Sequence, residues 1–259
     1  MGTGLNATPK DPIIVPGNEL VQQINNLFTN HYSNFVNVFI SSANDSVKGT
    51  LSEEELEFIK RLPSTKTEGL ISELPLYIGM PVFLTKNVST ELGLTNGTTG
   101  VIRSIPLKHQ PTKNNGITHL AQQPDYVVVE FNNASIEPLE GLPRNHVPVF
   151  AVNGSFSIKI GKKSVSIKRR HFPLVPAFGC TAHKSQGQTL SNVVVDLVPP
   201  KGMKNIDVSF VYVPLSRVRT LNDLTILRPF DISVLLRPLN QDCCDMMFDF
   251  KERDLCKNL

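Results

Sequence analysis

Residues 180–190, CTAHKSQGQTL, gather the side chains best suited to hold a phosphate or to move a proton. An imidazole, an ammonium, a hydroxyl and an amide stand in a row beside a glycine, at His183, Lys184, Ser185, Gln186 and Gly187. A second stretch about 30 residues later, YVPLSRVRTLNDLTIL, carries two arginines between an apolar helical segment and an apolar strand. Cations and amide donors of this kind suit charge-assisted hydrogen bonds to phosphate oxygens.

The elements on either side would place the first stretch at the edge of a sheet. The apolar run VPAFGCTA predicts a strand that ends at the polar residues, and NVVVDLV predicts the next buried strand. Between them, KSQGQTLS predicts a short helix that Ser185 could cap, which leaves backbone N–H groups free for an anion. In open α/β sheets this carboxyl edge is where ligands bind. The two arginines precede the strand LTIL, which would again place them near the sheet edge.

Two other interpretations of these stretches remain open at this point. A serine hydrolase would use His183 and Ser185, but they are only two residues apart and no GxSxG elbow occurs. Alternatively, the first stretch is a polar turn with a capped helix and no ligand. The arginines would then form surface salt bridges.

The N-terminal part predicts an α/β arrangement. A short buried strand at 13–15 is followed by a helix from Asn18, with an apolar face of Val21, Ile24, Leu27 and Phe28. Residues 35–40 predict a second strand. A second helix begins at Ser52, whose side chain and that of Glu55 form a capping box.

From about residue 74 the pattern changes to short strands with turns. The segments PVFLTKN, TGVIRSI, YVVVEFN and VPVFAV predict four strands. SFSIKI and SVSIKRR alternate apolar with polar residues and predict a hairpin with one apolar and one basic face. Strands in such a series suggest a small barrel. We therefore expect an α/β domain interrupted by a small all-β insertion.

Charge is unevenly distributed along the chain. The net charge is +3, yet residues 141–195 contain no acid and carry +8, so the remainder sums to −5. The basic residues of this window are Arg144, Lys159, Lys162, Lys163, Lys168, Arg169, Arg170 and Lys184. A concentrated basic window favours a polyanionic partner over a solvated lysine-rich face.

Composition excludes several classes of protein. The 259 residues are 40% hydrophobic and 19% charged, which is typical of a soluble globular protein. No apolar run approaches the roughly 20 residues of a membrane span, and the first residues lack the apolar core of a secretory signal. The four cysteines show no CxxC pair or zinc spacing, so we expect a reducing compartment and no metal site.

Taken together, the motifs resemble those of the PIF-type (RecD-like) DNA helicases of superfamily one. TAHKSQGQTLSNVVVDL is similar to motif V and YVPLSRVRTLNDLTIL to motif VI. GMPVFLTKN with GLTNGTTGVIRSI resembles the start of the family's SH3-like insertion, and PIIVPGNELVQQIN its entry into the second RecA-like lobe. The resemblance runs from about residue 12 to 229.

The resemblance implies roles for individual residues. Arg217 matches the arginine that reaches the γ-phosphate of ATP across the cleft between two RecA-like lobes. Gln186 and Gly187 match motif V residues that line this cleft, with Arg219 beside Arg217 as its structural companion. The remaining matches and candidates concern DNA: His183, Lys184 and Thr189 near the backbone, Lys86, Asn87 and Asn96 in the insertion, and Lys159, Lys168 and Arg170 in the hairpin.

The other half of an ATP cleft is missing from the sequence. No GxxxxGK[ST] occurs, and the nearest decoy, GSFSIKIGKKS, has six residues between its glycines and lies in the predicted hairpin. ATP and Mg²⁺ are thus expected to act in the complete enzyme and not to bind tightly to this chain.

The resemblance gives the expected organisation. Residues 1–73 would begin the RecA-like lobe, 74–166 would form the SH3-like insertion, 167–236 would complete the lobe, and 237–259 would be a tail. The expected activity is that of a C-terminal fragment of an ATP-dependent 5′-to-3′ DNA helicase, with single-stranded DNA and the missing first lobe as partners and no membrane. Alternatives are a non-enzymatic nucleic-acid-binding remnant or one half of a split helicase. The family implies DNA repair and telomere maintenance, in the nucleus or mitochondrion of a eukaryote or otherwise the cytoplasm, without secretion.

Overall fold

The computed structural model describes residues 11–47, 49, 51–108, 115–131, 136–161, 163–200 and 209–236. The predicted tail, Lys162 and three of the four cysteines lie outside these residues. The described residues form two compact units, one within 22–178 and one that joins the residues before 22 to those after 178. The segment between residue 22 and residue 73 therefore packs with the predicted insertion. The helicase-domain boundaries themselves stay a prediction.

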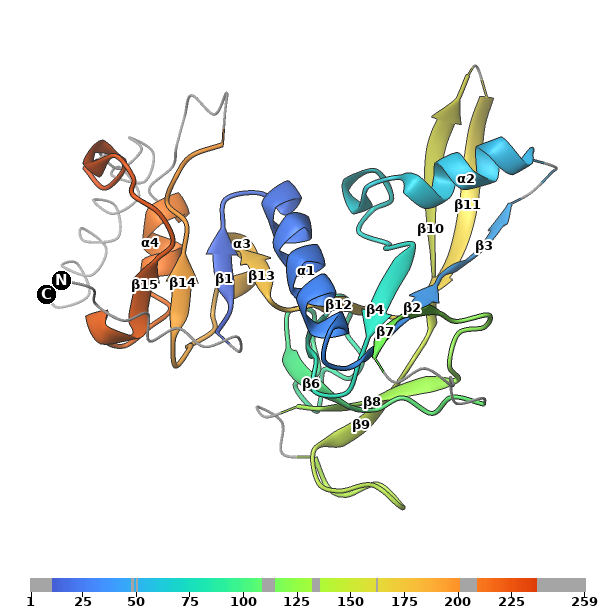
Figure 1. Ribbon diagram of the computed structural model, residues 1–259, viewed down its shortest axis with the longest axis horizontal. Coiled ribbons are helices and arrows are strands. Elements are labelled where there is room, and N and C mark those ends of the chain that lie inside the picture. Colours follow the sequence, from blue (N-terminus) through green and yellow to red (C-terminus); the bar gives the residue numbers. More distant parts are fainter. Residues whose placement is uncertain are drawn as a thin grey trace, which may run out of the picture. The chain divides into compact units, whose positions relative to one another are not determined.

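The unit formed by the two ends of the chain contains a four-stranded sheet in which every pair is parallel. Its strand order is β13 (Gly179–Thr181), β1 (Ile13–Val15), β14 (Val193–Val195) and β15 (Leu224–Ile226). Two short helices accompany it, α3 (Ala182–Ser185) and α4 (Ser209–Leu215) (Figure 1). All four strands predicted for this sheet are confirmed. The buried β-branched residues of β14 are typical of a strand inside a parallel sheet.

Past the carboxyl ends of β14 and β15, an ion pair ties the two strands together. Asp196 is buried and accepts hydrogen bonds from Nε of Arg228 at 2.9 Å and Nη2 at 2.7 Å. This contact raises the pKa of the Arg228 guanidinium. The bidentate geometry fixes the ends of both strands.

Unit 22–178 contains three sheets. The largest is an antiparallel five-stranded sheet in the order β12 (Leu174–Pro176), β5 (Pro81–Leu84), β6 (Thr99–Ser104), β8 (Tyr126–Glu130) and β9 (His146–Phe150). It includes the four strands predicted for the insertion. The overall α/β class with mixed sheets is confirmed, and closure of this sheet into an SH3-like barrel stays a prediction.

A mixed three-stranded sheet lies beside helix α1 (Asn18–Ser33) in Figure 1, and consists of β4 (Glu73–Leu76), β2 (Asn37–Ser42) and β7 (Gly116–His119). The predicted apolar face of α1 is wrong in part, because Leu27 is 68% exposed while Asn25 and Thr29 are buried. Asn25 Nδ2 donates to the Pro176 carbonyl at 3.3 Å, so a polar side chain takes a core position. Phe28 stacks on Phe178 with ring centroids 4.7 Å apart.

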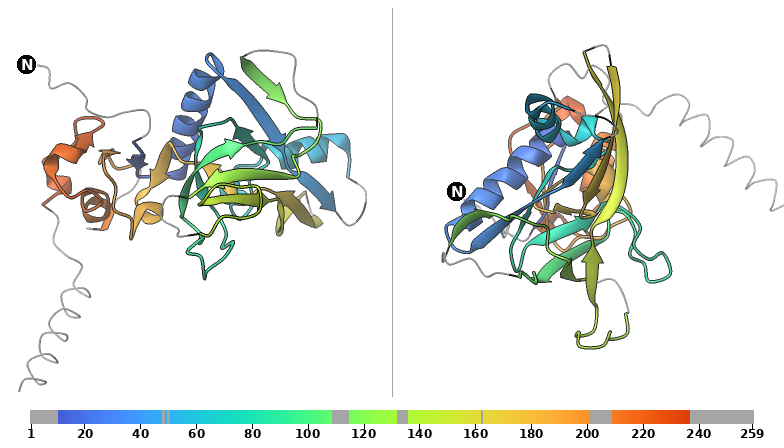
Figure 2. Two further views of the ribbon diagram at one scale, coloured as in Figure 1. Left: turned by 90° about the horizontal axis from the view of Figure 1, so that it is seen from below. Right: turned by 90° about the vertical axis from the view of Figure 1, so that its right-hand side faces the viewer.

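The third sheet of this unit is the long hairpin plus one further strand (Figure 2). Strands β10 (Val152–Ile160) and β11 (Lys163–His171) pair over nine residues, and β3 (Asn44–Val47) pairs with β11 on its other side. Its apolar face packs Phe156 and Ile167 against Ile59 of helix α2 (Glu53–Arg61). The predicted hairpin and the predicted capping box at the start of α2 are both confirmed.

Short 3-10 helices complete the described part at Ser64–Lys66, Leu221–Asp223 and Ile232–Val234.

Candidate nucleotide-side motifs and nucleic-acid interface

The motif at 180–190 folds as one helical turn followed by a sharp bend. Helix α3 ends at Ser185, so the helix predicted over KSQGQTLS is wrong. Ser185 closes the helix rather than capping its start, because its hydroxyl donates to the Ala182 carbonyl at 2.8 Å. Gln186 is extended and Gly187 has φ +79°, a left-handed conformation that glycine adopts without a steric cost.

Arg217 joins this bend to the end of α4. Its Nη1 donates to the carbonyls of Ser185 at 3.3 Å and Gln188 at 3.1 Å, which flank Gln186 and Gly187. Its Nε donates to the Val213 carbonyl at 2.8 Å, and its own carbonyl accepts from Leu190 N at 2.8 Å. Motifs that lie about 30 residues apart are thus in direct contact. The guanidinium has a structural role in addition to the role that the resemblance implies.

Arg219 differs from Arg217, because it is exposed and has no hydrogen bond or ion pair within the described residues. Arg217 itself makes the structural contacts at this bend, and the role of Arg219 as its companion stays a prediction. His183, Lys184, Gln186, Gly187 and Thr189 are also exposed, so a ligand could reach them.

Two side chains near the start of α3 have shifted pKa values. Surrounding protein atoms partly desolvate the Lys184 ammonium and lower its pKa although the side chain is exposed, and the neighbouring Cys180 opposes the shift. Burial raises the pKa of the Cys180 thiol to about 12, partly offset by Lys184. The thiol is therefore protonated and unreactive at neutral pH, as expected for a structural cysteine.

The donor set around this bend suits the phosphates of ATP better than its metal. It offers cations and an amide, whereas the described part of the chain contains no cluster of three His, Cys, Asp or Glu side chains that could hold a metal ion.

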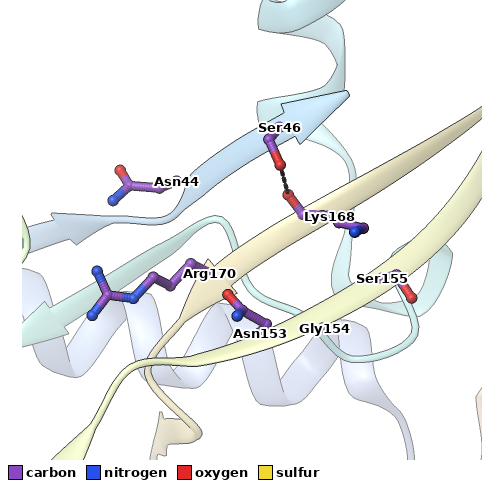
Figure 3. Close-up of a pocket in the computed structure, with 7 residues that line it drawn as sticks. All are labelled: Asn44, Ser46, Asn153, Gly154, Ser155, Lys168 and Arg170. Carbon is purple, nitrogen blue, oxygen red and sulfur yellow. Dashed lines mark hydrogen bonds between the residues drawn. The ribbon is translucent and has the colours of Figure 1, made fainter. Parts of the chain in front are cut away.

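A second candidate site lies on the exposed face of the hairpin sheet in unit 22–178. A pocket of about 390 Å³ opens there (Figure 3) and is lined by Asn44, Ser46, Asn153, Gly154, Ser155, Lys168 and Arg170. The predicted DNA contacts Lys168 and Arg170 are both in this pocket. Neither side chain has an ion pair or side-chain hydrogen bond within the described residues, so both cations are available to a ligand.

The other predicted DNA contacts of this unit are two lysines, which are described first, and the pair Asn87 and Asn96. Lys86 is adjacent to the pocket, because its Nζ donates to the Asn153 carbonyl at 3.2 Å. Lys159 is exposed farther along the hairpin, opposite Ser164. Asn87 Oδ1 instead accepts from Asn96 N at 2.8 Å, so this predicted pair holds the loop closed.

Arg169 does not contribute to the basic face. It is fully buried on the opposite face, where its guanidinium forms two hydrogen bonds of 2.7 Å with Asp45 and one of 2.8 Å with the Leu70 carbonyl. Its guanidinium carbon also lies 5.0 Å from the ring centre of Phe156. The sequence window counted Arg169 as a free cation. Strict alternation along β11 was the signal that it faces inward.

Five of the seven pocket residues were not among the predicted contacts, namely Asn44, Ser46, Asn153, Gly154 and Ser155. No local signal marks the first two, because β3 meets β11 only through pairing more than 120 residues distant in sequence.

His171 is the last residue of β11 and lies on the same inner face as Arg169. Burial and then the Lys86 ammonium lower the pKa of His171 to about 4. It is therefore neutral at pH 7.

Comparison with known proteins shows which proteins this chain is similar to. Residues 62–105, which include β4, β5 and β6, match the family described as "DNA helicase Pif1, 2B domain". The resemblance to PIF-type helicases is thus confirmed, and it covers part of the full helicase. No helix in the described residues is long and apolar enough to cross a membrane.

Individual relatives agree with this class. The chain is 27% identical over 189 residues to the ATP-dependent DNA helicase Pif1 of Psychrobacter sp. and 30% identical over 169 residues to ATP-dependent DNA helicase PIF1 of Danio rerio. These alignments cover 64% and 65% of this chain but only 28% and 21% of the relatives.

Solved structures share the fold over most of the chain. The Pif1 helicase of Candida albicans has a TM-score of 0.57 at 22% identity, covering 94% of this chain and 50% of that one. Bacteroides Pif1 bound to single-stranded DNA has a TM-score of 0.59 at 17% identity, covering 96% and 47%. The chain therefore spans about half of the solved Pif1 chains that it matches.

Proposed function

We propose that the chain is the C-terminal part of an ATP-dependent 5′-to-3′ DNA helicase. In this proposal the parallel-sheet unit is the second RecA-like lobe, and the five-stranded sheet is the SH3-like insertion. The single observation that carries the proposal is the contact of Arg217 with the carbonyls on both sides of Gln186 and Gly187. Two motifs that the resemblance assigns to one ATP cleft thus meet in space.

On the nucleotide side, Arg217 would stabilise the charge that develops on the transferring phosphoryl group. In well-studied NTPases an arginine of this kind contributes about 10³–10⁵ in rate. Gln186 and Gly187 would line the cleft, and Arg219, which is exposed, would be free to approach the nucleotide. Bacteroides Pif1, a relative in fold, has been solved in complex with ADP-AlF4, which supports ATP as the substrate of the complete enzyme.

On the DNA side, each unit offers exposed donors that could contact a strand. His183, Lys184 and Thr189 are exposed in the first unit, and Lys168 and Arg170 line the pocket of the second. The structure of Bacteroides Pif1 bound to single-stranded DNA supports this choice of ligand. A basic groove that follows the backbone is the general way in which proteins hold single strands.

A second candidate function is DNA binding without ATP hydrolysis, as a remnant or as one half of a split helicase. The observation that favours it is the lack of a GxxxxGK[ST] sequence in this chain. For either function we propose a nuclear or mitochondrial location in a eukaryote and a cytoplasmic one otherwise. DNA repair and telomere maintenance would be the processes served.

Binding of single-stranded DNA by the chain alone tests both candidates at once. Fluorescence anisotropy with a labelled oligonucleotide of about 12 thymidines should show saturable binding that weakens as salt rises. An unlabelled single strand should compete better than a duplex of equal length. If no binding occurs at low salt, the DNA side of the proposal is wrong.

A further inference from the structure

The exposed face of the hairpin sheet has a regular order that goes beyond the pocket. Strand pairing arranges its exposed side chains in four rows across the sheet. The rows are Asn153–Arg170–Asn44, Ser155–Lys168–Ser46, Ser157–Ser166 and Lys159–Ser164. We call these ten residues the donor ladder.

All ten side chains of the donor ladder can donate a hydrogen bond, and all ten are exposed. Three carry a positive charge and none carries a negative one. The one carboxylate of β3, Asp45, points to the other face and is neutralised by Arg169. Since no carboxylate of these strands competes on this face, the ligand that fits it is rich in anionic acceptor oxygens.

The spacing of the rows favours a nucleic-acid backbone over a single anion. Exposed residues along one strand repeat every second position, so neighbouring rows lie about 6.6 Å apart. That interval is comparable to the distance between neighbouring phosphates of an extended strand. Four rows in a line extend over about 20 Å. A straight single strand can follow the sheet over this length. Each strand of a duplex winds around the helix axis and would turn away from the sheet after a short contact.

The ladder also lacks what sequence-specific recognition needs. Its members are serines, asparagines, lysines and one arginine, with no aromatic side chain on which a base could stack. Contacts from such residues to phosphates fix a strand without reading its sequence. The pocket lies between the first two rows, where two cations stand among two amides and two hydroxyls. This is the densest group of donors on the face.

We propose that the donor ladder is a sequence-independent track for single-stranded DNA, which takes about one phosphate per row, with its tightest subsite in the pocket of Lys168 and Arg170. The proposal rests on the proposed function and adds Asn44, Ser46, Asn153 and Ser155 to the DNA path. Buried Arg169 has an indirect part, because its contacts with Asp45 hold β3 where Asn44 and Ser46 complete the first two rows.

The test uses the full chain, a labelled oligonucleotide of 12 thymidines, and anisotropy titrations at several salt concentrations. Each phosphate contact contributes a slope of about −0.7 to log K against log salt on single strands. The triple variant Lys159→Gln, Lys168→Gln and Arg170→Gln should therefore flatten the slope by about 2. The matched control, Lys60→Gln, Lys66→Gln and Lys108→Gln, removes the same charge from exposed positions outside the ladder and should leave the slope unchanged.

An uncharged variant separates direct contact from overall charge. Asn44→Ala with Ser46→Ala should weaken binding by about five- to tenfold while leaving the slope unchanged, because the lost hydrogen bonds are uncharged and release no counterion. If the wild type binds but the ladder triple and the control triple behave alike, the ladder is not the track and the proposed function stands. Preferential loss of duplex binding in the ladder variant would contradict the choice of a single strand. If the wild type binds no DNA, both proposals fail.

Discussion

Arg217 shows at the scale of a single residue how a motif side chain can serve structure and chemistry together. Its guanidinium donates to three main-chain carbonyls and to the Ser216 hydroxyl, so most of its donors are occupied in this state. To reach a γ-phosphate, Arg217 would have to release at least some of these partners. The resemblance alone assigns Arg217 only the contact with the γ-phosphate.

The structure instead predicts that Arg217→Ala loosens the bend at 185–190. Loss of its hydrogen bonds should cost about 1–3 kcal/mol of local stability, discounted for partial exposure. Hydrogen-exchange mass spectrometry should detect exchange in this segment that is about tenfold or more faster. Arg219→Ala is the matched control, because Arg219 is exposed, has no partner among the described residues and should change exchange by less than about twofold. Equal effects of both substitutions would show that the carbonyl contacts do not hold the bend.

At the scale of the elements, a long-range ion pair joins β3 to the hairpin, in addition to its backbone pairing with β11. Arg169 and Asp45 stand directly opposite each other in the β11–β3 pair and form two hydrogen bonds of 2.7 Å. The Arg169 side chain is 0% exposed and that of Asp45 11%. Removing one partner of such a pair leaves an uncompensated buried charge.

Asp45→Ala should therefore lower the unfolding free energy of unit 22–178 by about 3–5 kcal/mol, measured by urea denaturation. The double variant Asp45→Ala with Arg169→Met replaces the pair by apolar groups and should recover most of that loss. A double variant that is less stable than Asp45→Ala would contradict this account of β3.

The elements also show why some features could be predicted from sequence and others could not. The capping box of α2 needs only Ser52 and Glu55, three residues apart, so its chemistry is local and was predicted correctly. The strand β3 has the sequence NDSV, which has little intrinsic preference for a strand. It pairs with the distant strand β11, where Arg169 binds Asp45. The face of α1 was misjudged for the same reason, because Asn25 is buried through a bond to the distant Pro176 carbonyl.

The candidate site follows the same division. Residue types alone located both motif stretches and the basic hairpin, since cations and amides at strand ends are visible in a sequence. The end of α3 at Ser185 could not be predicted, because it is coupled to Arg217 more than 30 residues away. The alternation along β11 already indicates that Arg169 faces inward, whereas its partner Asp45 could be identified only from the register of the sheet.

At the scale of the whole molecule, the proposed function assigns to the two units the two kinds of contact that a helicase must combine. One brings Gln186, Gly187 and Arg217 together, and the other presents the donor ladder. The chain spans only part of the helicases that it resembles. In the proposed function, ATP hydrolysis therefore needs a further lobe that supplies a P-loop. The chain alone is expected to bind DNA without turning over ATP.

The most direct test of this central claim is DNA-stimulated phosphate release by the chain before and after fusion to a P-loop lobe taken from a bacterial Pif1. We predict no turnover by the chain alone and DNA-dependent turnover by the fusion. In the fusion, Arg217→Lys should lower kcat by at least about 10³, while Arg219→Lys stays within about tenfold of the unsubstituted protein. Turnover by the chain alone that Lys163→Ala abolishes, or a fusion in which Arg217→Lys retains full kcat, would contradict the account.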